Sequence, residues 1–527
     1  MIRTISAGFC HAPHTTIAPG SAGLPEAPLT VFGTRIRSVR EVADRVARLA
    51  AGLRSVGVQA GDRVAMLALN SDRYFEYLLA VPWADAVINP VNIRWSAAEI
   101  AYSFRDSETA VLFIDDAYVA MLPQLRDSYP GGLRTVVYCG DGEPPEGTVG
   151  YEDLIAAHAP VADARRGGDE VAGIFYTGGT TGFPKGVTLT HRNMMTQYYG
   201  ILASRCYLRS GSVYLHAAPM FHLADLAGWG AQLVLGGPHV IIPSFDPVRT
   251  LEAVQEHRVT DALLVPTMVQ LLVDHPAIDE YDTGSLETVL YAGSPMAPAL
   301  LDRAMVRFAG TTFIQGYGMT ELAAACTMLR ADLDRASDAF RRSAGRALPH
   351  NEVMIVDPDD NEVPRGTVGE VVVRGGNVMA GYWNNPEATA AVLRDGWMHT
   401  GDGAYMDESG YIYIVDRLKD MIVTGGENVY SAEVENAVAT HPDVLACAVI
   451  GIPDADWGER VHAVVVARPG STIDAAAVRQ HVRGLIAAYK APRSVDFVDA
   501  LPTTGAGKVL KRSLREAHWS AAERQVN

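Results

Sequence analysis

Apolar and polar positions repeat up to about residue 345 in a way that predicts helices followed by buried strands. Between Ser38 and Leu53 apolar residues recur every three or four positions, as on one face of a helix, and Ser38 with Glu41 has the capping-box spacing. Short apolar runs predict strands at 64–69, 111–114, 171–176, 262–265 and 289–292. Such an alternation is typical of parallel sheets covered by helices on both faces, so the predicted fold class is α/β.

The pattern changes beyond residue 345. Short alternating runs at 370–374 and 411–415 predict a β-rich subdomain, and a tail with strands at 445–450 and 461–466 predicts a small α+β domain. A charged segment, 416–420, separates the tail from the preceding strand. We therefore expect a large N-terminal domain over 1–417, a linker at 418–420 and a small C-terminal domain over 421–527.

Composition limits the function classes. The chain has 527 residues, 48% of them hydrophobic and 20% charged, which is ordinary for a globular protein. Its net charge of −17 argues against nucleic acid as a partner, because such a surface repels phosphate. Five scattered cysteines without a CxxC pair indicate neither a disulfide framework nor a zinc site. With no apolar run of 18 residues and no signal-like N-terminus, we expect a cytoplasmic protein without a transmembrane segment.

A loop rich in glycine and threonine follows the strand predicted at 171–176. Glycines let successive backbone N–H groups point at an anion, while threonine hydroxyls and one lysine add donors and positive charge, so the loop predicts a phosphate site. It is not a Walker A loop, because Pro184 stands where that motif has glycine before its lysine. The candidate phosphate ligands are Thr177, Gly178, Gly179, Thr180, Thr181, Gly182 and Lys185.

This loop resembles the phosphate-binding signature of the adenylate-forming superfamily, which comprises acyl-CoA synthetases, adenylation domains and luciferases. The resemblance runs the length of the chain. Its further motifs are Gln315-Gly-Tyr-Gly-Met-Thr-Glu321, Gly369-Glu-Val-Val-Val-Arg-Gly375, Gly381-Tyr-Trp-Asn384, Asp395-Gly-Trp-Met-His-Thr-Gly-Asp402, Asp416-Arg-Leu-Lys-Asp420, Gly425-Gly-Glu-Asn428 and Leu501-Pro-Thr-Thr-Gly-Ala-Gly-Lys508.

The resemblance implies an acid–thiol ligase that uses ATP, Mg²⁺ and CoA. A carboxylic acid would first form acyl-AMP and pyrophosphate, and CoA would then displace AMP. Joining two anions requires positioning and charge neutralisation. Tyr317 would stack on adenine, Thr320 would reach the α-phosphate, and Glu321 with Thr177 would hold Mg²⁺. The other ATP contacts implied in this region are Gly293, Ser294, Gln315, Gly316, Gly318 and Met319.

The resemblance also assigns residues near the domain boundary. Asp402 and Arg417 would bind the ribose hydroxyls, and Lys508, on the mobile C-terminal domain, would bridge the carboxylate and the α-phosphate. Lys419 would contact the nucleotide and serve as the hinge about which that domain rotates. The N-terminal domain, 1–417, would then be the adenylation domain with the ATP and acyl pockets.

The acceptor side is also implied by the family pattern. Gly425 and Gly426 would line the pantetheine passage, Trp457 and Tyr489 would stack on the CoA adenine, and Arg493 would pair with its phosphates. His222 would stand between the acyl pocket and this passage, in a gating and positioning role.

The segments expected to line the acyl pocket are rich in small and apolar residues, and no arginine is evident in them. They predict a hydrophobic acid, either a medium- or long-chain fatty acid or a bulky polycyclic acid. Two alternative functions and the assembly stay open. An aryl or amino acid could be loaded on a carrier protein instead of CoA, with Asp225 placed to meet an ammonium group. A nucleotide-binding regulator without catalysis is less consistent with Glu321, Asp402, Arg417 and Lys508. A homodimer is one option for the assembly.

Overall fold

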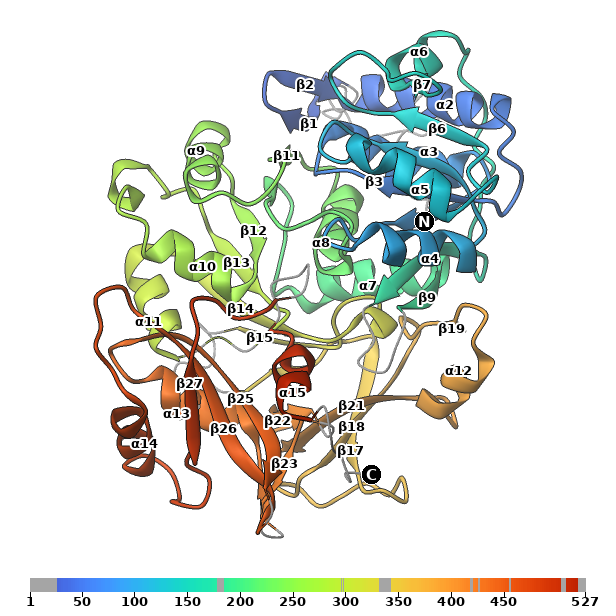
Figure 1. The fold of residues 1–527 in the computed structure, drawn as a ribbon. Helices are drawn as coiled ribbons and strands as arrows, with labels where there is room; N and C mark the ends of the chain where they lie inside the picture. The colour runs from blue at the N-terminus through green and yellow to red at the C-terminus, as the bar shows by residue number, and fades with distance from the viewer. Residues whose placement is uncertain are drawn as a thin grey trace.

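The structure, a computed structural model, describes residues 26–177, 184–294, 296, 298–330, 343–417, 420–424, 427–454, 456–503 and 509–519. Four β-sheets form the framework of these residues, and helices cover them (Figure 1). Among the helices in these ranges, none has the length and apolar character needed to span a lipid bilayer.

The first sheet has the strand order β19-β9-β8-β4-β3-β5-β6-β7. Its strands from β3 to β8 pair in parallel, while β9 and β19 add an antiparallel edge. The bounds are β3 (Arg63–Leu67), β4 (Val87–Pro90), β5 (Thr109–Ile114), β6 (Thr135–Tyr138), β7 (Val149–Gly150), β8 (Val171–Thr177), β9 (Lys185–Thr190) and β19 (Gly381–Tyr382).

Helices connect these strands. In the first of them, α2, the side chain of Ser38 accepts from the backbone N–H of Glu41 and the Glu41 side chain accepts in return, which confirms the predicted capping box. The bounds are α2 (Val39–Ser55), α3 (Asp72–Trp83), α4 (Ala97–Asp106), η2 (Val119–Met121), α5 (Leu122–Ser128), α6 (Tyr151–Ala156) and α7 (His191–Ser204).

The second sheet has the order β16-β15-β14-β13-β12-β10-β11-β1-β2, parallel in its centre and antiparallel at both edges. Its strands are β1 (Pro28–Phe32), β2 (Arg35–Ser38), β10 (Tyr214–His216), β11 (His239–Ile241), β12 (Asp261–Leu264), β13 (Thr288–Tyr291), β14 (Thr312–Tyr317), β15 (Thr327–Arg330) and β16 (Arg346–Ala347). Its helices are α8 (Leu223–Leu235), α9 (Pro247–His257), α10 (Pro266–Val273), η3 (Ile278–Glu280), α11 (Pro298–Arg307) and η4 (Thr320–Leu322).

Aromatic side chains join the two large sheets through the helices between them. The ring of Phe75 on α3 contacts Trp229 on α8 edge to face, with 5.7 Å between centroids, and both are fully buried. Strands β13 and β14 are parallel, so the loops that follow them lie at one edge of the second sheet. The carboxyl end of β8 borders the same cavity as these loops. Ligands bind at such strand ends in open α/β sheets.

The third sheet is antiparallel and forms the predicted β-rich subdomain. Strands β17, β18, β21 and β20 follow one another in it, and β22 pairs with β21. The bounds are β17 (Asn351–Val356), β18 (Gly369–Gly375), α12 (Pro386–Val392), β20 (Leu393–Arg394), β21 (Trp397–Met406) and β22 (Ile412–Arg417).

The C-terminal part has its own sheet and its own hydrophobic core. The prediction of two strands there was wrong by omission, because three short strands that lack a clear apolar alternation also pair. The bounds are β23 (Ile422–Thr424), β24 (Glu427–Val429), α13 (Ser431–Ala439), β25 (Val444–Asp454), β26 (Gly458–Ala467), α14 (Ala475–Arg483), β27 (Ser494–Phe497) and α15 (Lys511–Trp519). The predicted α/β fold, with a large parallel-rich part followed by a smaller α+β part, is confirmed.

Candidate active site

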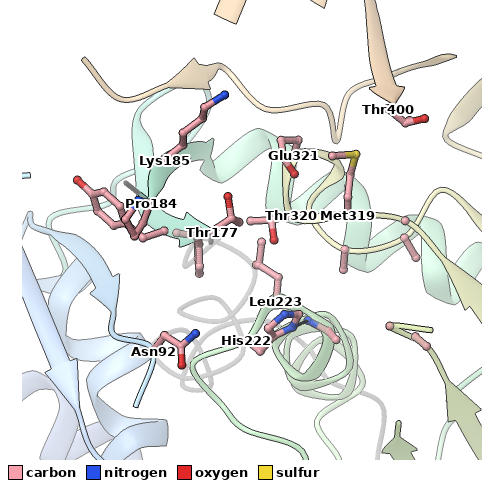
Figure 2. Close-up of a pocket in the computed structure, with 18 of the residues that line it drawn as sticks. Asn92, Thr177, Pro184, Lys185, His222, Leu223, Met319, Thr320, Glu321 and Thr400 are labelled. Carbon is pink, nitrogen blue, oxygen red and sulfur yellow. Dashed lines mark hydrogen bonds between the residues drawn. The ribbon is translucent and has the colours of Figure 1, made fainter. Parts of the chain in front are cut away.

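A cavity of about 1010 Å³ lies where the ends of β8 and β14, the start of α8 and the third sheet meet (Figure 2). The amino-terminal half of α15 borders it through Arg512, Ser513 and Glu516, so the C-terminal part closes one side. Predicted site residues that line the cavity are Thr177, Lys185, His222, Gly293, Gly316, Gly318, Met319, Thr320 and Glu321.

The two ends of the predicted phosphate loop stand opposite each other. The antiparallel register of β8 and β9 pairs Thr177 with Lys185, which places the hydroxyl-bearing and the ammonium-bearing residue at one mouth of the cavity. The Lys185 ammonium lies over the ring of Tyr382, 5.0 Å from its centroid. The intervening residues Gly178, Gly179, Thr180, Thr181 and Gly182 lie outside the described residues, as do Lys419, Gly425, Gly426 and Lys508.

Glu321 is a buried carboxylate that borders the cavity. It lies in η4, is 6% exposed, and its Oε1 accepts a hydrogen bond of 2.8 Å from the Tyr382 hydroxyl. Burial and the neighbouring Glu321 carboxylate raise the pKa of Tyr382, so the hydroxyl remains a donor to that carboxylate. This contact fixes the carboxylate and leaves its other oxygen without a bond to Tyr382.

The donor atoms around Glu321 fit a magnesium ion. Its carboxylate and the hydroxyls of Thr177 and Thr320 border the same cavity (Figure 2). These are hard oxygen ligands, and Mg²⁺ in nucleotide sites takes one or two protein carboxylates together with phosphate oxygens and water. The chemistry of the residues present therefore agrees with the predicted metal.

The turn that carries Thr320 and Glu321 depends on close backbone packing. A Cβ atom on Gly318 would lie 2.3 Å from the carbonyl oxygen of Ala324 and 2.6 Å from the Cα of Ala325. Ala323 and Ala324 have φ angles of +53° and +120°, which non-glycine residues rarely adopt. Strained backbone of this kind is held by its surroundings and gathers at functional sites.

Tyr317 and Asp402 lie together beside this turn. The Tyr317 hydroxyl donates to Oδ2 of Asp402 over 2.8 Å, and burial with the adjacent Asp402 carboxylate raises the pKa of the tyrosine. The ladder between β21 and β22 pairs Asp402 with Arg417, so the two predicted ribose ligands are cross-strand neighbours. The Arg417 side chain lies outside the described residues.

Two other predicted nucleotide residues stand slightly apart. Gln315 pairs with Leu329 across β14 and β15, and its Oε1 lies 3.4 Å from the Tyr291 hydroxyl. Ser294 is exposed next to Gly293, whose φ of +91° suits glycine. Neither Gln315 nor Ser294 is among the residues that border the cavity.

His222 caps helix α8 at the edge of the cavity. Its Nδ1 accepts from the backbone N–H of Ala224 over 3.2 Å, so the neutral ring carries its proton on Nε2. Figure 2 shows His222 beside Leu223 at the start of the helix. The ring is thus held in place by the helix terminus, which suits a positioning role.

Asp225, three residues further on, does not face the cavity. Its side chain is fully buried, and Oδ2 lies 2.6 Å from Nδ1 of His216, whose Nε2 lies 2.9 Å from Nδ1 of His239. A carboxylate committed to this internal network cannot meet an ammonium group of a bound acid. The structure therefore removes the residue that kept the amino-acid alternative open.

The inner wall of the cavity is apolar. It is lined by small and aliphatic side chains from α8, β12, β13 and the segment after η4, namely Ala224, Ala227, Leu263, Leu290, Ala325 and Met328. Three arginines that the sequence did not indicate, Arg94, Arg394 and Arg512, border other parts of the cavity. None of the three belongs to the segments predicted to line the acyl pocket.

The three described CoA candidates lie outside the lining of the cavity. The guanidinium of Arg493 stacks on Trp457, 4.1 Å from the ring centroid, and Trp457 is 44% exposed. Tyr489 is 42% exposed, and its ring lies 5.8 Å from the Lys490 ammonium. The structure thus pairs Trp457 with Arg493 on the surface of the C-terminal part.

Sequence reasoning missed residues that support the site from β19 of the first sheet and from β18 and β21 of the third. Tyr382 orients Glu321, and His399, whose Nδ1 lies 2.9 Å from Oε2 of Glu370, borders the cavity together with Thr400. Tyr382, Glu370 and His399 all lie inside motifs that carried the resemblance. Their roles depend on contacts between distant segments, which spacing along the chain does not reveal.

Comparison with known proteins identifies the family. The AMP-binding enzyme family matches residues 20–383, and the AMP-binding enzyme C-terminal domain matches residues 433–508. The chain therefore belongs to the AMP-binding enzymes, the adenylate-forming superfamily predicted from its motifs.

Similar proteins cover almost the whole chain. A feruloyl-CoA synthase from Amycolatopsis sp is 43% identical over 497 residues, 93% of this chain and 96% of that protein. A fatty acid–acyl-carrier-protein ligase from Streptomyces coeruleorubidus is 33% identical over 508 residues, 95% of this chain and 96% of that protein. The ATP-bound crystal structure of MatB from Rhodopseudomonas palustris superposes with a TM-score of 0.86 at 32% identity, over 98% and 99% of the two chains.

Proposed function

We propose that the protein is an AMP-forming acyl-CoA ligase for a bulky hydrophobic carboxylic acid. One observation carries the proposal. A single cavity is bordered by the Thr177–Lys185 pair, by the buried Glu321 and by an apolar inner wall. The ammonium, the carboxylate and the hydroxyl can bind a nucleotide and its metal ion, and the apolar wall beside them can bind an acyl group. This arrangement fits an enzyme whose two substrates are ATP and a carboxylic acid.

In the first half-reaction a carboxylate oxygen attacks the α-phosphorus of ATP, and pyrophosphate leaves. Thr177 and Lys185, with the residues 178–182 between them, would bind the phosphates, and Thr320 would donate to the α-phosphate. Glu321, oriented by Tyr382, would hold Mg²⁺ with Thr177, and that ion supplies charge neutralisation between the phosphates. Lys508 would bring its ammonium to the carboxylate and the α-phosphate.

The remaining nucleotide contacts come from the strands around the turn. Tyr317 would stack on the adenine, with its hydroxyl bonded to Asp402. Asp402 would accept hydrogen bonds from the ribose hydroxyls, and its cross-strand neighbour Arg417 would donate to them. Gly293, Ser294, Gln315, Gly316, Gly318 and Met319 complete the proposed binding surface. Gly316, Gly318 and Met319 lie along or directly after β14, whose carboxyl end points at the cavity.

In the second half-reaction a thiolate attacks the acyl carbon, and AMP leaves. An ammonium that bridges the carboxylate and phosphate would stand in the path of the thiol, so the C-terminal domain, 421–527, must rotate on the hinge 418–420 at Lys419. Gly425 and Gly426 would then line the pantetheine passage. Trp457, Tyr489 and Arg493 are the proposed contacts of the CoA nucleotide, and the exposed stack of Trp457 with Arg493 offers an aromatic face and positive charge.

The acid is proposed to be at least as large as an aromatic acid. Alanines at 224, 227 and 325 leave the inner wall wide, and the feruloyl-CoA synthase is the relative with 43% identity. Acetate-sized acids would leave such a chamber underfilled and would gain little binding energy. The acids to be compared are hydroxycinnamic, medium- and long-chain fatty, and polycyclic acids.

The proposal is tested by pyrophosphate release over this acid panel, followed by thioester formation with free CoA or with a phosphopantetheinylated carrier protein. Acid-dependent pyrophosphate release and rapid turnover with CoA support it. Turnover only with the carrier protein identifies the second candidate, which the acyl-carrier-protein ligase among the relatives favours. Absence of pyrophosphate release with every acid contradicts catalysis altogether and leaves the regulator alternative.

Two further features belong to the proposal. A cytoplasmic location agrees with a need for ATP and CoA. A homodimer stays a prediction, and sedimentation of the full chain measures it.

A further inference from the structure

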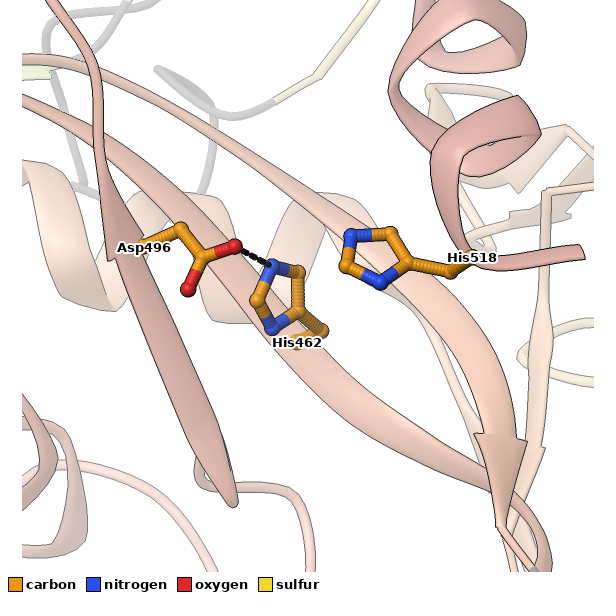
Figure 3. Close-up of side chains that lie close together, drawn as sticks. All are labelled: His462, Asp496 and His518. Atoms are coloured by element: carbon orange, nitrogen blue, oxygen red, sulfur yellow. Dashed lines mark ion pairs between the residues drawn. The ribbon is translucent and has the colours of Figure 1, made fainter.

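Two histidines and a carboxylate converge where α15 packs on the C-terminal sheet, and none of them lines the cavity (Figure 3). They are His462 on β26, Asp496 on β27 and His518 on α15. One nitrogen of each imidazole and one carboxylate oxygen all lie within 4.8 Å of one another. None of the three residues has a part in the proposed reaction.

His462 has the burial and the hydrogen bonding expected of a metal ligand. Its side chain is 2% exposed, and its Nδ1 lies 2.8 Å from the Ser494 hydroxyl. Its Nε2 is buried and has no hydrogen-bond partner among the described residues, while Oδ2 of Asp496 lies 3.5 Å away. A buried nitrogen without a partner is costly. In the tautomer in which Nδ1–H donates to the Ser494 hydroxyl, the Nε2 lone pair is directed at the cluster and can bind a metal ion.

The scaffold holds the three side chains on one face. The parallel register pairs His462 with Ser494, and Asp496 lies two residues further along β27, so both face the same side as His462. His518 follows Lys511 and Arg515 on one face of α15. That face is anchored by an ion pair of 2.8 Å between Lys511 and Glu435 and by a contact between Arg515 and Asp420.

The end of α15 is fixed next to the cluster. The indole N–H of Trp519 donates to the carbonyl oxygen of Gly451 over 3.0 Å, and the rings of His462 and His518 have centroids 4.9 Å apart. His518 therefore reaches the sheet beside His462, as Figure 3 shows. An isolated surface histidine would not be held in this way.

We propose that His462, Asp496 and His518 form a binding site for a divalent transition-metal ion, with Zn²⁺ as the best-matched ion. Two imidazoles and one carboxylate are ligands that zinc accepts, with water in the fourth position. Ligand atoms on a tetrahedral zinc lie about 3.3 Å apart, given zinc–nitrogen distances near 2.0 Å. The present separations are at most 4.8 Å, so the ligand atoms would have to approach one another by at most about 1.5 Å, and Asp496 and His518 are less buried than His462.

The bound ion would join β27 and β26 to α15. This helix follows the segment 504–508 and borders the active-site cavity through Arg512, Ser513 and Glu516. The site would thus stabilise the helix that connects the C-terminal sheet with the cavity. The proposal concerns metal binding and stability and does not depend on the identity of the acid or on catalysis.

The test uses the full chain, freed of metal with a chelator and kept without nucleotide, which would itself bind zinc. Titration with Zn²⁺ in the presence of millimolar Mg²⁺ is followed by calorimetry, by metal analysis after gel filtration and by thermal unfolding. We expect one tightly held zinc ion per chain and a higher unfolding temperature. Co²⁺ in place of Zn²⁺ should give the visible absorption of a four-coordinate ion.

Two variants assign the site. His518→Gln and Asp496→Asn should each weaken zinc affinity at least tenfold and abolish the thermal shift and the cobalt spectrum. His481→Gln is the matched control, because His481 also lies within 4.9 Å of another histidine, His441, in the same domain but outside the cluster. Absence of stoichiometric zinc binding, or unchanged binding in both site variants, would overturn the proposal.

Discussion

Glu321 and Tyr382 form the contact on which the proposed magnesium site depends. The carboxylate is almost fully buried, and the Tyr382 hydroxyl donates to it over 2.8 Å, while the Tyr382 ring lies beneath the Lys185 ammonium. Partners that orient a metal-binding carboxylate influence metal affinity strongly. Tyr382 is therefore expected to affect magnesium use more than folding.

Tyr382→Phe removes this hydrogen bond and keeps the ring beneath Lys185. We expect the Mg²⁺ concentration for half-maximal adenylation to rise about tenfold, because the freed carboxylate is no longer oriented. Stability should fall by only about 1 kcal/mol. The measurement is acid-dependent ATP–pyrophosphate exchange over a magnesium series, with Tyr281→Phe, outside the cavity lining, as control. An unchanged magnesium dependence would contradict the role given to Tyr382.

Gly318→Ala tests the turn that presents Thr320 and Glu321. The new methyl group would collide with backbone atoms of Ala324 and Ala325, so the turn itself has to shift. We expect adenylation to fall about a hundredfold, the effect of misplacing reacting groups by about 1 Å. Gly167→Ala is the matched control, since a Cβ atom there meets nothing within 4 Å, and its rate should stay within about twofold. Equal rates in the two variants would argue against a fixed turn.

At this scale the sequence predicts residue types better than their contacts. The Thr177–Lys185 pair could be anticipated, because the loop begins and ends in one short motif. The Glu321–Tyr382 bond could not, since it joins residues 61 positions apart. Asp225 shows the opposite error, because its position suggested a pocket ligand and only the structure reveals its bond to His216.

At the scale of elements, helix α8 lies between the proposed nucleotide and acyl sides of the cavity. His222 caps its start, and Ala224 and Ala227, three residues apart on one face, border the cavity. The small side chains on this face leave the space that the proposed acid would fill. Bulk added here should alter the choice of acid without touching the phosphate contacts.

Ala227→Phe places a ring in that space. We expect kcat/KM for a hydroxycinnamic or long-chain acid to fall about a hundredfold, whereas a short acid such as butyrate should change by less than about threefold. Pyrophosphate release measured for both acids on the same preparation gives an internal control. A uniform loss for both acids would show that α8 affects something other than the acyl chamber.

Elements with a strong apolar pattern or a helix cap could be predicted from the sequence, and short strands without such a pattern could not. Helix α2 and the strands β3, β5, β8, β12 and β13 lie within two residues of their predicted bounds, since each is a continuous apolar pattern. The short strands β23, β24 and β27 were missed because their pairing partners, rather than their own sequences, make them strands.

At the scale of the whole molecule, buried neutral histidines should set the acid limit of stability. Burial lowers the pKa of His191 to about 3 and the pKa of His350 to about 4, below the ordinary value of 6.5. The unfolded chain then binds more protons than the folded chain between about pH 4 and 6.5. The stability that these groups contribute is complete above pH 6.5 and is lost as the pH falls through this range.

His350→Gln should reduce this loss. Between pH 7 and pH 5 we expect the wild-type protein to lose roughly 1–2 kcal/mol more stability than the variant, because one proton uptake on unfolding is removed. Urea unfolding at both pH values measures the difference. The same pH dependence in both proteins would show that His350 is not held neutral by burial.

In the proposed mechanism one cavity serves two reactions, and Lys508 acts in the first alone. Lys508→Ala is compared with Lys490→Ala, a lysine of the same domain that pairs with Glu433. Each variant is assayed for acid-dependent ATP–pyrophosphate exchange and, separately, for conversion of supplied acyl-adenylate and CoA to thioester. We expect Lys508→Ala to lose the first activity by orders of magnitude and to keep the second, whereas Lys490→Ala should keep the first. Equal loss of both half-reactions in Lys508→Ala would contradict this mechanism.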